Sequence, residues 1–303
     1  MEQQVDIEGG ITLCAETFGD ASDPPLVLVA GLGQQMIGWP EGFCEELVGH
    51  GFHVVRFDNR DAGRSWHAGF RPPQRSQLVT RRFHPDQYSL ADMAGDLAGL
   101  LDALGLHPAH VVGISMGGMI AQTLAAQHPD QVRSLVSIMS TTGSSRVGWT
   151  APSTLRLMFR KPPRTRDEAA ERAATMWQHI GSHGFPFDES YVRERAAAGF
   201  DRDPKGAVGS GRQLGAIRKS GDRTRQLRHV RAPTLVIHGD RDRMVHPSGG
   251  RATAQAISGA RLVTIPGLGH DLPRGAWPRL AQLIAGHAQA ANDRRTSTQV
   301  AAR

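Results

Sequence analysis

The chain has 303 residues, of which 39% are hydrophobic and 21% charged. This composition is typical of a folded globular protein, and the length suffices for one α/β domain with an inserted segment. The formal net charge is +6, but the basic residues are dispersed and only 2 tyrosines occur in the chain. The charge therefore does not indicate a nucleic-acid-binding surface, and we expect no nucleic-acid partner.

The cysteines and the N-terminus indicate the environment in which the chain works. Cys14 and Cys44 lie among apolar neighbours without the spacing of a metal site, so we expect buried thiols and no metal. The first residues lack the basic and apolar regions of a signal peptide, and no apolar run approaches the roughly 20 residues that span a membrane. We expect a soluble, cytoplasmic monomer or homodimer with no membrane partner.

The N-terminal part of the chain predicts short strands separated by turns. Residues 5–18 alternate between apolar and polar side chains and are interrupted by two glycines, which predicts a hairpin at a sheet edge. Residues 26–29 form a continuous apolar run, as in a parallel strand covered on both faces. The glycine-rich loop 30–33 follows, then a predicted helix over 41–48 and a predicted strand over 53–57.

The loop after that strand, residues 58–65, is dense in charged side chains. We expect its Asp and Arg side chains to tie neighbouring loops together beneath the site. Residues 70–85 are basic and contain prolines, which predicts a long exposed loop. Residues 90–104 predict a helix, because apolar side chains recur at helical spacing, and residues 132–139 predict a further strand.

The pattern changes after the first half of the chain. Between residues 142 and 228 strand signals give way to helical and basic stretches punctuated by prolines, which predicts a mostly helical cap. Strands return at 234–237 and 262–265, and a last helix is predicted over 277–287. The expected organisation is a doubly wound, mostly parallel sheet with one insertion: core 1–141 and 229–290, cap 142–228, and disordered tail 291–303.

One stretch has the pattern expected of a catalytic nucleophile. An apolar strand over 109–114 runs directly into a helix, and Gly113-Ile114-Ser115-Met116-Gly117 lies between them. Gly-x-Ser-x-Gly at a strand-to-helix turn is the pattern of a nucleophile elbow, in which the serine sits on a strained turn and a side chain at either glycine would clash. We therefore expect Ser115 to be a catalytic nucleophile.

A serine nucleophile needs a base, and the base needs a carboxylate that orients it. His270 lies in a glycine-flanked loop just after the last predicted strand and is the expected base. Asp240 and Asp242 both follow the strand at 234–237, and either could be the acid. The N–H of Met116, at the start of a helix, would point to where an oxyanion forms.

With these residues in place, the chain resembles an α/β-hydrolase-fold serine esterase over about residues 5–287. It is similar in particular to esterases of the aclacinomycin methylesterase and macrolide esterase type. The segments that carry this resemblance are Gly38-Trp39-Pro40, Arg56 to Asp61, Gly113 to Gly117, Pro186-Phe187-Asp188-Glu189 and Ile265 to His270.

The resemblance implies further roles. The family spacing Gly-x-x-Asp favours Asp242 as the acid, and the alternative location at residues 140–145 contains no carboxylate. The second oxyanion donor is expected to be the backbone N–H of Leu32, paired with that of Met116. Many relatives have histidine before the oxyanion residues, whereas this chain has Ala30, which removes a side chain that often braces the loop.

We expect a cofactor-free serine carboxylic ester hydrolase that acts through an acyl-enzyme on a small-molecule ester, such as a bulky natural-product ester or macrolide lactone. Thioesterase, lactonase and acyltransferase activities use the same triad, and a ligand-binding protein without turnover could retain it; the sequence leaves these open. An expected substrate pocket would be lined by Trp39, Met119, Met158, Trp177 and Phe187.

Overall fold

Eight strands form a single sheet in the computed structural model, which describes the backbone of residues 2–301 and the side chains of residues 2–294. The strands are β1 Gln3–Ile7, β2 Ile11–Phe18, β3 Pro25–Val29, β4 His53–Phe57, β5 Ala109–Ile114, β6 Val132–Ile138, β7 Thr234–Gly239 and β8 Arg261–Ile265. Their spatial order is β1-β2-β4-β3-β5-β6-β7-β8; the pairs β1–β2 and β2–β4 are antiparallel, and the other pairs are parallel. The predicted mostly parallel α/β fold is confirmed.

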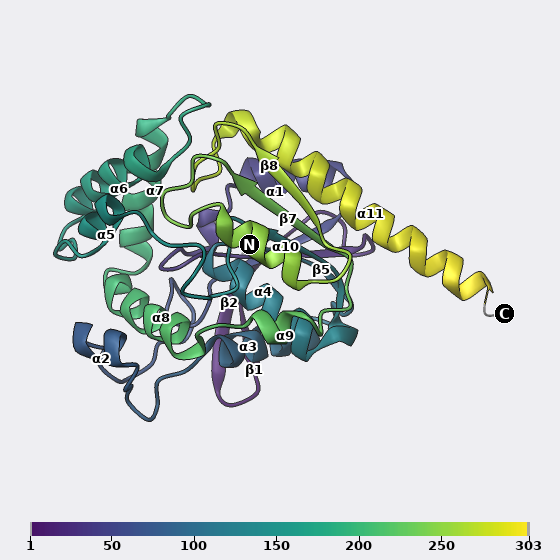
Figure 1. The fold of residues 1–303 in the computed structure, drawn as a ribbon, viewed down its shortest axis with the longest axis horizontal. Helices are drawn as coiled ribbons and strands as arrows, with labels where there is room; N and C mark the ends of the chain where they lie inside the picture. Colours follow the sequence, from purple (N-terminus) through teal and green to yellow (C-terminus); the bar gives the residue numbers. More distant parts are fainter. Residues whose placement is uncertain (1, 302–303) are drawn as a thin grey trace.

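Helices cover both faces of this sheet (Figure 1). Helices α1 (Glu41–Gly49) and α11 (Trp277–Ala301) pack together against one face. The other face carries α3 (Leu90–Ala103), α4 (Met116–Gln127), α9 (Thr224–Leu227) and α10 (Ser248–Ala256). Short 3₁₀ turns lie at Met36–Gly38, Pro129–Gln131 and Arg274–Ala276.

The central strands are buried on both faces, which explains their continuous apolar sequence. In β3, Val27 and Val29 belong to the hydrophobic cluster under α3 and α4, whereas Leu26 and Leu28 belong to the cluster under α1 and α11. Successive side chains of a strand point to opposite faces, so a strand between two helical layers must be apolar at every position. This core holds the carboxyl ends of β5, β7 and β8 in fixed relative positions.

The segment predicted as the cap, residues 142–228, is helical throughout its regular structure. It contains α5 (Pro152–Met158), α6 (Arg166–Ile180), α7 (Glu189–Arg202) and α8 (Gly206–Ser220), followed by α9. In Figure 1 helices α5 to α8 lie on one side of the molecule, beside the carboxyl ends of the parallel strands. The last helix of the segment, α9, instead packs on α4 and α10 of the core.

Two segments differ from the expected pattern. The predicted loop 70–85 contains the short helix α2 (Arg75–Thr80), which begins with a capping box between Gln74 and Gln77. Helix α11 continues to Ala301, into the expected tail 291–303, and residues 302–303 lie outside the described residues. Within the part of the chain that the structure describes, no helix is long and apolar enough to cross a membrane.

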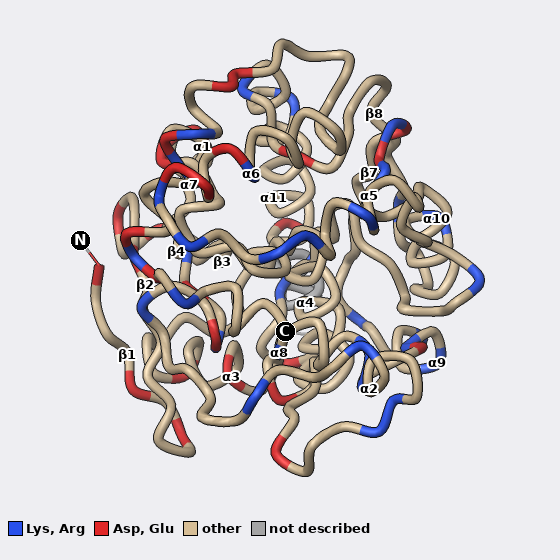
Figure 2. Tube along the Cα trace, turned by 90° about the vertical axis from the view of Figure 1, so that its left-hand side faces the viewer, with Lys and Arg blue, Asp and Glu red and all other residues tan. Residues whose placement is uncertain are grey.

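Charged side chains are spread over the molecule. Figure 2 shows Lys and Arg on segments of many elements, interleaved with Asp and Glu. This distribution matches the dispersed charge seen in the sequence.

Candidate active site

Ser115 lies on the sharp turn between β5 and α4 that the sequence predicts. Its φ of 55° is in the left-handed region, which a non-glycine residue occupies only at a cost of about 1–3 kcal/mol. The flanking glycines make the turn possible, because a Cβ at Gly113 would overlap the Gly117 carbonyl and one at Gly117 would overlap the Val29 carbonyl. Ser115 is half-buried and lies directly before the first residue of α4.

A hydrogen-bonded chain joins three of the predicted residues. His270 Nε2 lies 3.0 Å from Ser115 Oγ, and His270 Nδ1 lies 2.7 Å from Asp242 Oδ2. With its proton on Nδ1, the imidazole donates to the carboxylate and leaves Nε2 free to accept the serine proton. The three side chains follow β5, β7 and β8, which the parallel sheet places with their carboxyl ends on the same side, β6 lying between β5 and β7.

Asp242 is held as an anion by its surroundings. Its Oδ1 accepts the backbone N–H groups of Met244 and Val245, each at 2.8 Å, and His238 Nε2 lies 3.3 Å from Oδ2. Burial alone would raise the pKa of this carboxyl, but His270 and His238 hold the pKa well below its usual range. The carboxylate is thus charged and oriented at neutral pH.

The other candidate acid, Asp240, points elsewhere. Its Oδ1 accepts the N–H of Gly267 at 2.7 Å, and its side chain is 41% exposed. It therefore fixes the start of the loop that carries His270 without reaching the imidazole.

The loop that contains Leu32 lies directly against Ser115. A Cβ built on Gly31 would be 3.4 Å from Ser115 Cβ, so this loop passes the elbow with room for no more than a methyl group between them. Met116 is the first residue of α4, and the N–H groups of a first helical turn have no partner within the helix. The two predicted oxyanion donors therefore come from segments that meet at the serine.

Beneath this loop, the charged segment 58–65 has the structural role expected from its sequence. Asp58 accepts the N–H of Met36 at 2.6 Å and is paired with Arg202 of α7 at 2.6 Å. Asp61 receives two hydrogen bonds from Arg212 of α8. Both carboxylates are fully buried and tie α7 and α8 to the segment 58–65.

Residues at and just after the end of α6 also hold the loop of His270, a contact that the sequence does not predict. Ile180, at the end of α6, accepts the N–H of His270 at 2.8 Å. Ser182 Oγ accepts the N–H of Gly269 at 2.9 Å and donates to Asp271. Gly269 and Ser182 are 87 residues apart in the sequence, so no local pattern predicts the contact.

The expected pocket residues occupy different environments. Met119 follows Ser115 by one helical turn, and its N–H donates to the Ser115 carbonyl. Trp39 is only 1% exposed and stacks on Phe43 in the core under α1. On the cap, Phe187 is 37% exposed, and two half-buried residues come from α5 and α6, namely Met158 and Trp177.

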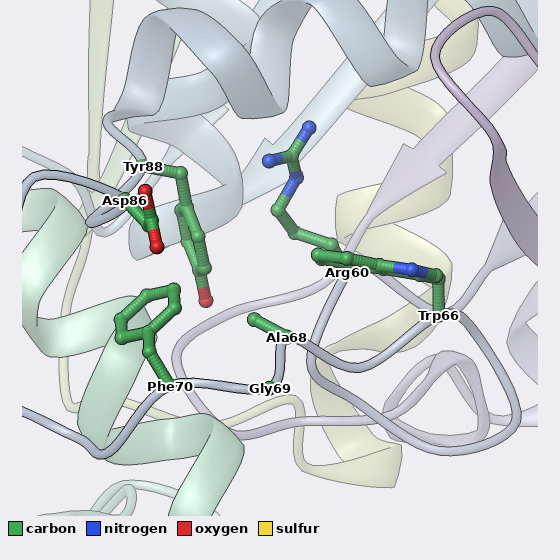
Figure 3. Close-up of a pocket in the computed structure, with 7 residues that line it drawn as sticks. All are labelled: Arg60, Trp66, Ala68, Gly69, Phe70, Asp86 and Tyr88. Carbon is green, nitrogen blue, oxygen red and sulfur yellow. The ribbon is translucent and has the colours of Figure 1, made fainter.

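Two surface cavities lie apart from the triad. A cavity of about 440 Å³ is lined by Arg60, Trp66, Ala68, Gly69, Phe70, Asp86 and Tyr88, with the Phe70 and Tyr88 rings facing Trp66 across it (Figure 3). A second, of about 360 Å³, shares Gly69 and Phe70 with the first. Neither cavity is lined by Ser115, Asp242 or His270.

Comparison with known proteins agrees with this architecture. A family model described as the alpha/beta hydrolase fold matches residues 24–273. Rhodomycin D methylesterase DnrP from Streptomyces peucetius is 31% identical, over 93% of this chain and 96% of its own length. This similarity confirms the predicted resemblance to methylesterases of the aclacinomycin type.

Solved structures show the same fold. A hydrolase from Pseudomonas aeruginosa PA01 superposes with a TM-score of 0.70 at 25% identity, covering 96% of this chain and 97% of the other. The enol-lactonase from Burkholderia xenovorans LB400 gives a TM-score of 0.73 at 22% identity, covering 95% and 100%. The chain therefore belongs to the alpha/beta hydrolase fold family and is a carboxylic ester hydrolase.

Proposed function

We propose that this enzyme is a serine hydrolase that cleaves carboxylic esters through an acyl-enzyme. The observation that carries the proposal is the continuous hydrogen-bonded chain from Ser115 Oγ through His270 to Asp242. A serine hydroxyl becomes a useful nucleophile when a neighbouring base accepts its proton, and this geometry supplies the base and its orienting carboxylate.

In the proposed first step, Ser115 Oγ attacks the ester carbonyl while His270 Nε2 takes the hydroxyl proton. The tetrahedral oxyanion accepts hydrogen bonds from the N–H groups of Leu32 and Met116. Collapse of this intermediate expels the alcohol, which takes the proton from His270, and leaves the acyl group on Ser115. Water, deprotonated by His270, then attacks the acyl-enzyme; the second tetrahedral intermediate releases the carboxylic acid as His270 returns the proton to Ser115 Oγ.

For the substrate, we propose a bulky natural-product ester. A macrolide lactone is a cyclic ester and would be cleaved by the same steps. Support comes from the related methylesterases, which are named for rhodomycin D, and from the helical cap beside the carboxyl ends of the strands. The expected lining from Met119, Met158, Trp177 and Phe187 belongs to this proposal. Trp39 would contribute only from within the core.

Hydrolysis of p-nitrophenyl butyrate, an aromatic polyketide methyl ester and a macrolide lactone tests the proposal. We expect turnover by the intact protein, loss of turnover in Ser115→Ala, and covalent labelling by a fluorophosphonate only when Ser115 is present. Ser134→Ala is the matched control, because Ser134 is buried on β6 and contacts His110 rather than the triad. Labelling or turnover that survives in Ser115→Ala would overturn the serine mechanism.

A further inference from the structure

Gln213 is a buried amide that joins the cap to the loop beside Ser115. It lies on α8 and is fully buried, at 0% exposed. Its Oε1 accepts the N–H of Gly33 at 2.8 Å, and its Nε2 donates to the carbonyl of Arg60 at 2.8 Å. Because each end of the amide has its own core partner, the side chain has one favourable orientation.

Helix α8 packs closely on this loop. Gly33 has a φ of +66°, and a Cβ there would be 2.5 Å from Ser210 Oγ, one turn before Gln213 on the helix. Only a glycine allows the cap helix and the loop to approach this closely while Gln213 reaches the Gly33 N–H.

The hydrogen bond from the Gly33 N–H to Gln213 lies next to the peptide group that carries the Leu32 N–H. Asn59 Nδ2 donates to the Ala30 carbonyl at 3.1 Å, which anchors the peptide group between residues 30 and 31. Gln213 anchors the peptide group between residues 32 and 33 through the Gly33 N–H. The peptide group between these two anchors carries the N–H of Leu32.

We propose that Gln213 is a positioning residue for the oxyanion hole: it orients the Leu32 N–H from the cap side, opposite Asn59. This inference rests on the serine mechanism proposed above. The Gly31 carbonyl of the same peptide group accepts the N–H of Gln34 at 3.1 Å, and because Ala30 offers no polar side chain, the side-chain anchors of the loop come from Asn59 and from α8. The oxyanion hole is then complete only while α8 is docked, which couples the cap to the chemical step.

Gln213→Met and Gln213→Asn test this role. Methionine keeps the length and volume but forms no hydrogen bond to Gly33, and asparagine keeps the amide on a stem too short to reach both partners. The matched control is Gln87→Met, because Gln87 is also a buried amide at the cap boundary but donates to the Arg212 and Tyr88 carbonyls. The measurements are kcat and KM for p-nitrophenyl butyrate and the Ki of an alkyl boronic acid, which forms a tetrahedral adduct on the serine.

We expect kcat to fall about 10- to 100-fold in the folded Gln213 variants, since a small misplacement of a catalytic group costs up to about 100-fold. KM should change little, and the boronate Ki should rise by the same factor as kcat/KM falls. Gln87→Met should keep the wild-type values. Gln213→Asn serves as the readout if the methionine variant does not fold.

A folded Gln213 variant with wild-type kcat and Ki, or one in which only KM changes, would overturn the inference. An equal loss in Gln87→Met would also overturn it, because the effect would then belong to cap packing in general. Failure of the underlying mechanism is recognised separately: Ser115→Ala would retain turnover, and the inference would fall with it.

Discussion

Replacement of Asp242 by asparagine tests the catalytic arrangement most directly. In the native site Oδ1 accepts two backbone N–H groups, from Met244 and Val245, while Oδ2 faces His270 Nδ1. The asparagine carbonyl must take the place of Oδ1, because turning the amide over would aim an NH₂ group at two buried donors. That reversal would cost about 1–3 kcal/mol for each unsatisfied donor.

The asparagine NH₂ therefore faces His270, and it can only donate. The imidazole must then accept at Nδ1 and carry its proton on Nε2, where it can no longer receive the proton of Ser115. Loss of the correct tautomer in this way lowers kcat about 10⁴-fold, which corresponds to about 5 kcal/mol of transition-state stabilisation. The fold should be preserved, since the two side chains have nearly the same shape.

The assay is the steady-state hydrolysis of p-nitrophenyl butyrate, with far-UV circular dichroism to verify folding. Asp240→Asn is the matched control: Asp240 lies two residues before Asp242, and the carbonyl oxygen of the asparagine can still accept the Gly267 N–H. We expect its kcat to remain within about threefold of wild type, as for an exposed neutral replacement. An Asp242→Asn enzyme within tenfold of wild type, or a larger loss in Asp240→Asn, would refute the reasoning.

Three further predictions concern stability. Gly117→Ala should lower the free energy of unfolding by about 3 kcal/mol or more, because its Cβ would overlap a backbone carbonyl. Gly95→Ala is the control: it has open space in α3 and should raise the free energy of unfolding by about 0.4–1 kcal/mol. Thermal unfolding compares the two variants, and equal effects would contradict the clash. Arg212→Met should cost about 3–5 kcal/mol in urea unfolding, since Asp61 would remain buried without its cation, and a loss below 1 kcal/mol would contradict this. Burial lowers the pKa of His110 from 6.5 to about 4, so the folded protein binds fewer protons than the unfolded chain below about pH 6.5; stability should fall by about 3 kcal/mol as the pH decreases from 6.5 to 4, and His110→Gln should flatten this dependence of the urea midpoint.

Local chemistry explains how much of the fold was predictable from the sequence. Residues 26–29 are an apolar run and residues 53–57 are rich in β-branched and aromatic side chains, each next to turn residues, and the structure places β3 and β4 at those positions. The elbow at Ser115 was predictable because Gly-x-Ser-x-Gly encodes a steric requirement within five consecutive residues. By contrast, α2 within 70–85 is a short exposed helix without an apolar face, so no periodicity marks it.

The choice between Asp240 and Asp242 shows where residue-level reasoning stops. Both carboxylates follow β7, and periodicity cannot determine which one turns inward, because the loop after a strand has no fixed side-chain direction. The structure separates them by their donors: Asp242 is turned toward His270 by two backbone N–H groups, whereas Asp240 bonds Gly267. Only the family spacing carried this information into the sequence analysis.

The residues that hold the catalytic loops from the cap were beyond any local pattern. Gln213 and Gly33 are 180 residues apart, and the buried positions of α8 are two glycines, an arginine, a glutamine and a single alanine rather than an apolar stripe. A buried amide is favourable only when each end finds a partner, and the partners here are backbone groups of the core loops. The polar inner face of α8 is therefore what a helix requires when it packs on loops, whose backbone groups need hydrogen bonds, instead of on a sheet. It follows that Gln213 of α8 and Ser182 after α6, both buried and polar, mark the places where the segment 142–228 bonds the loops beside Ser115 and His270.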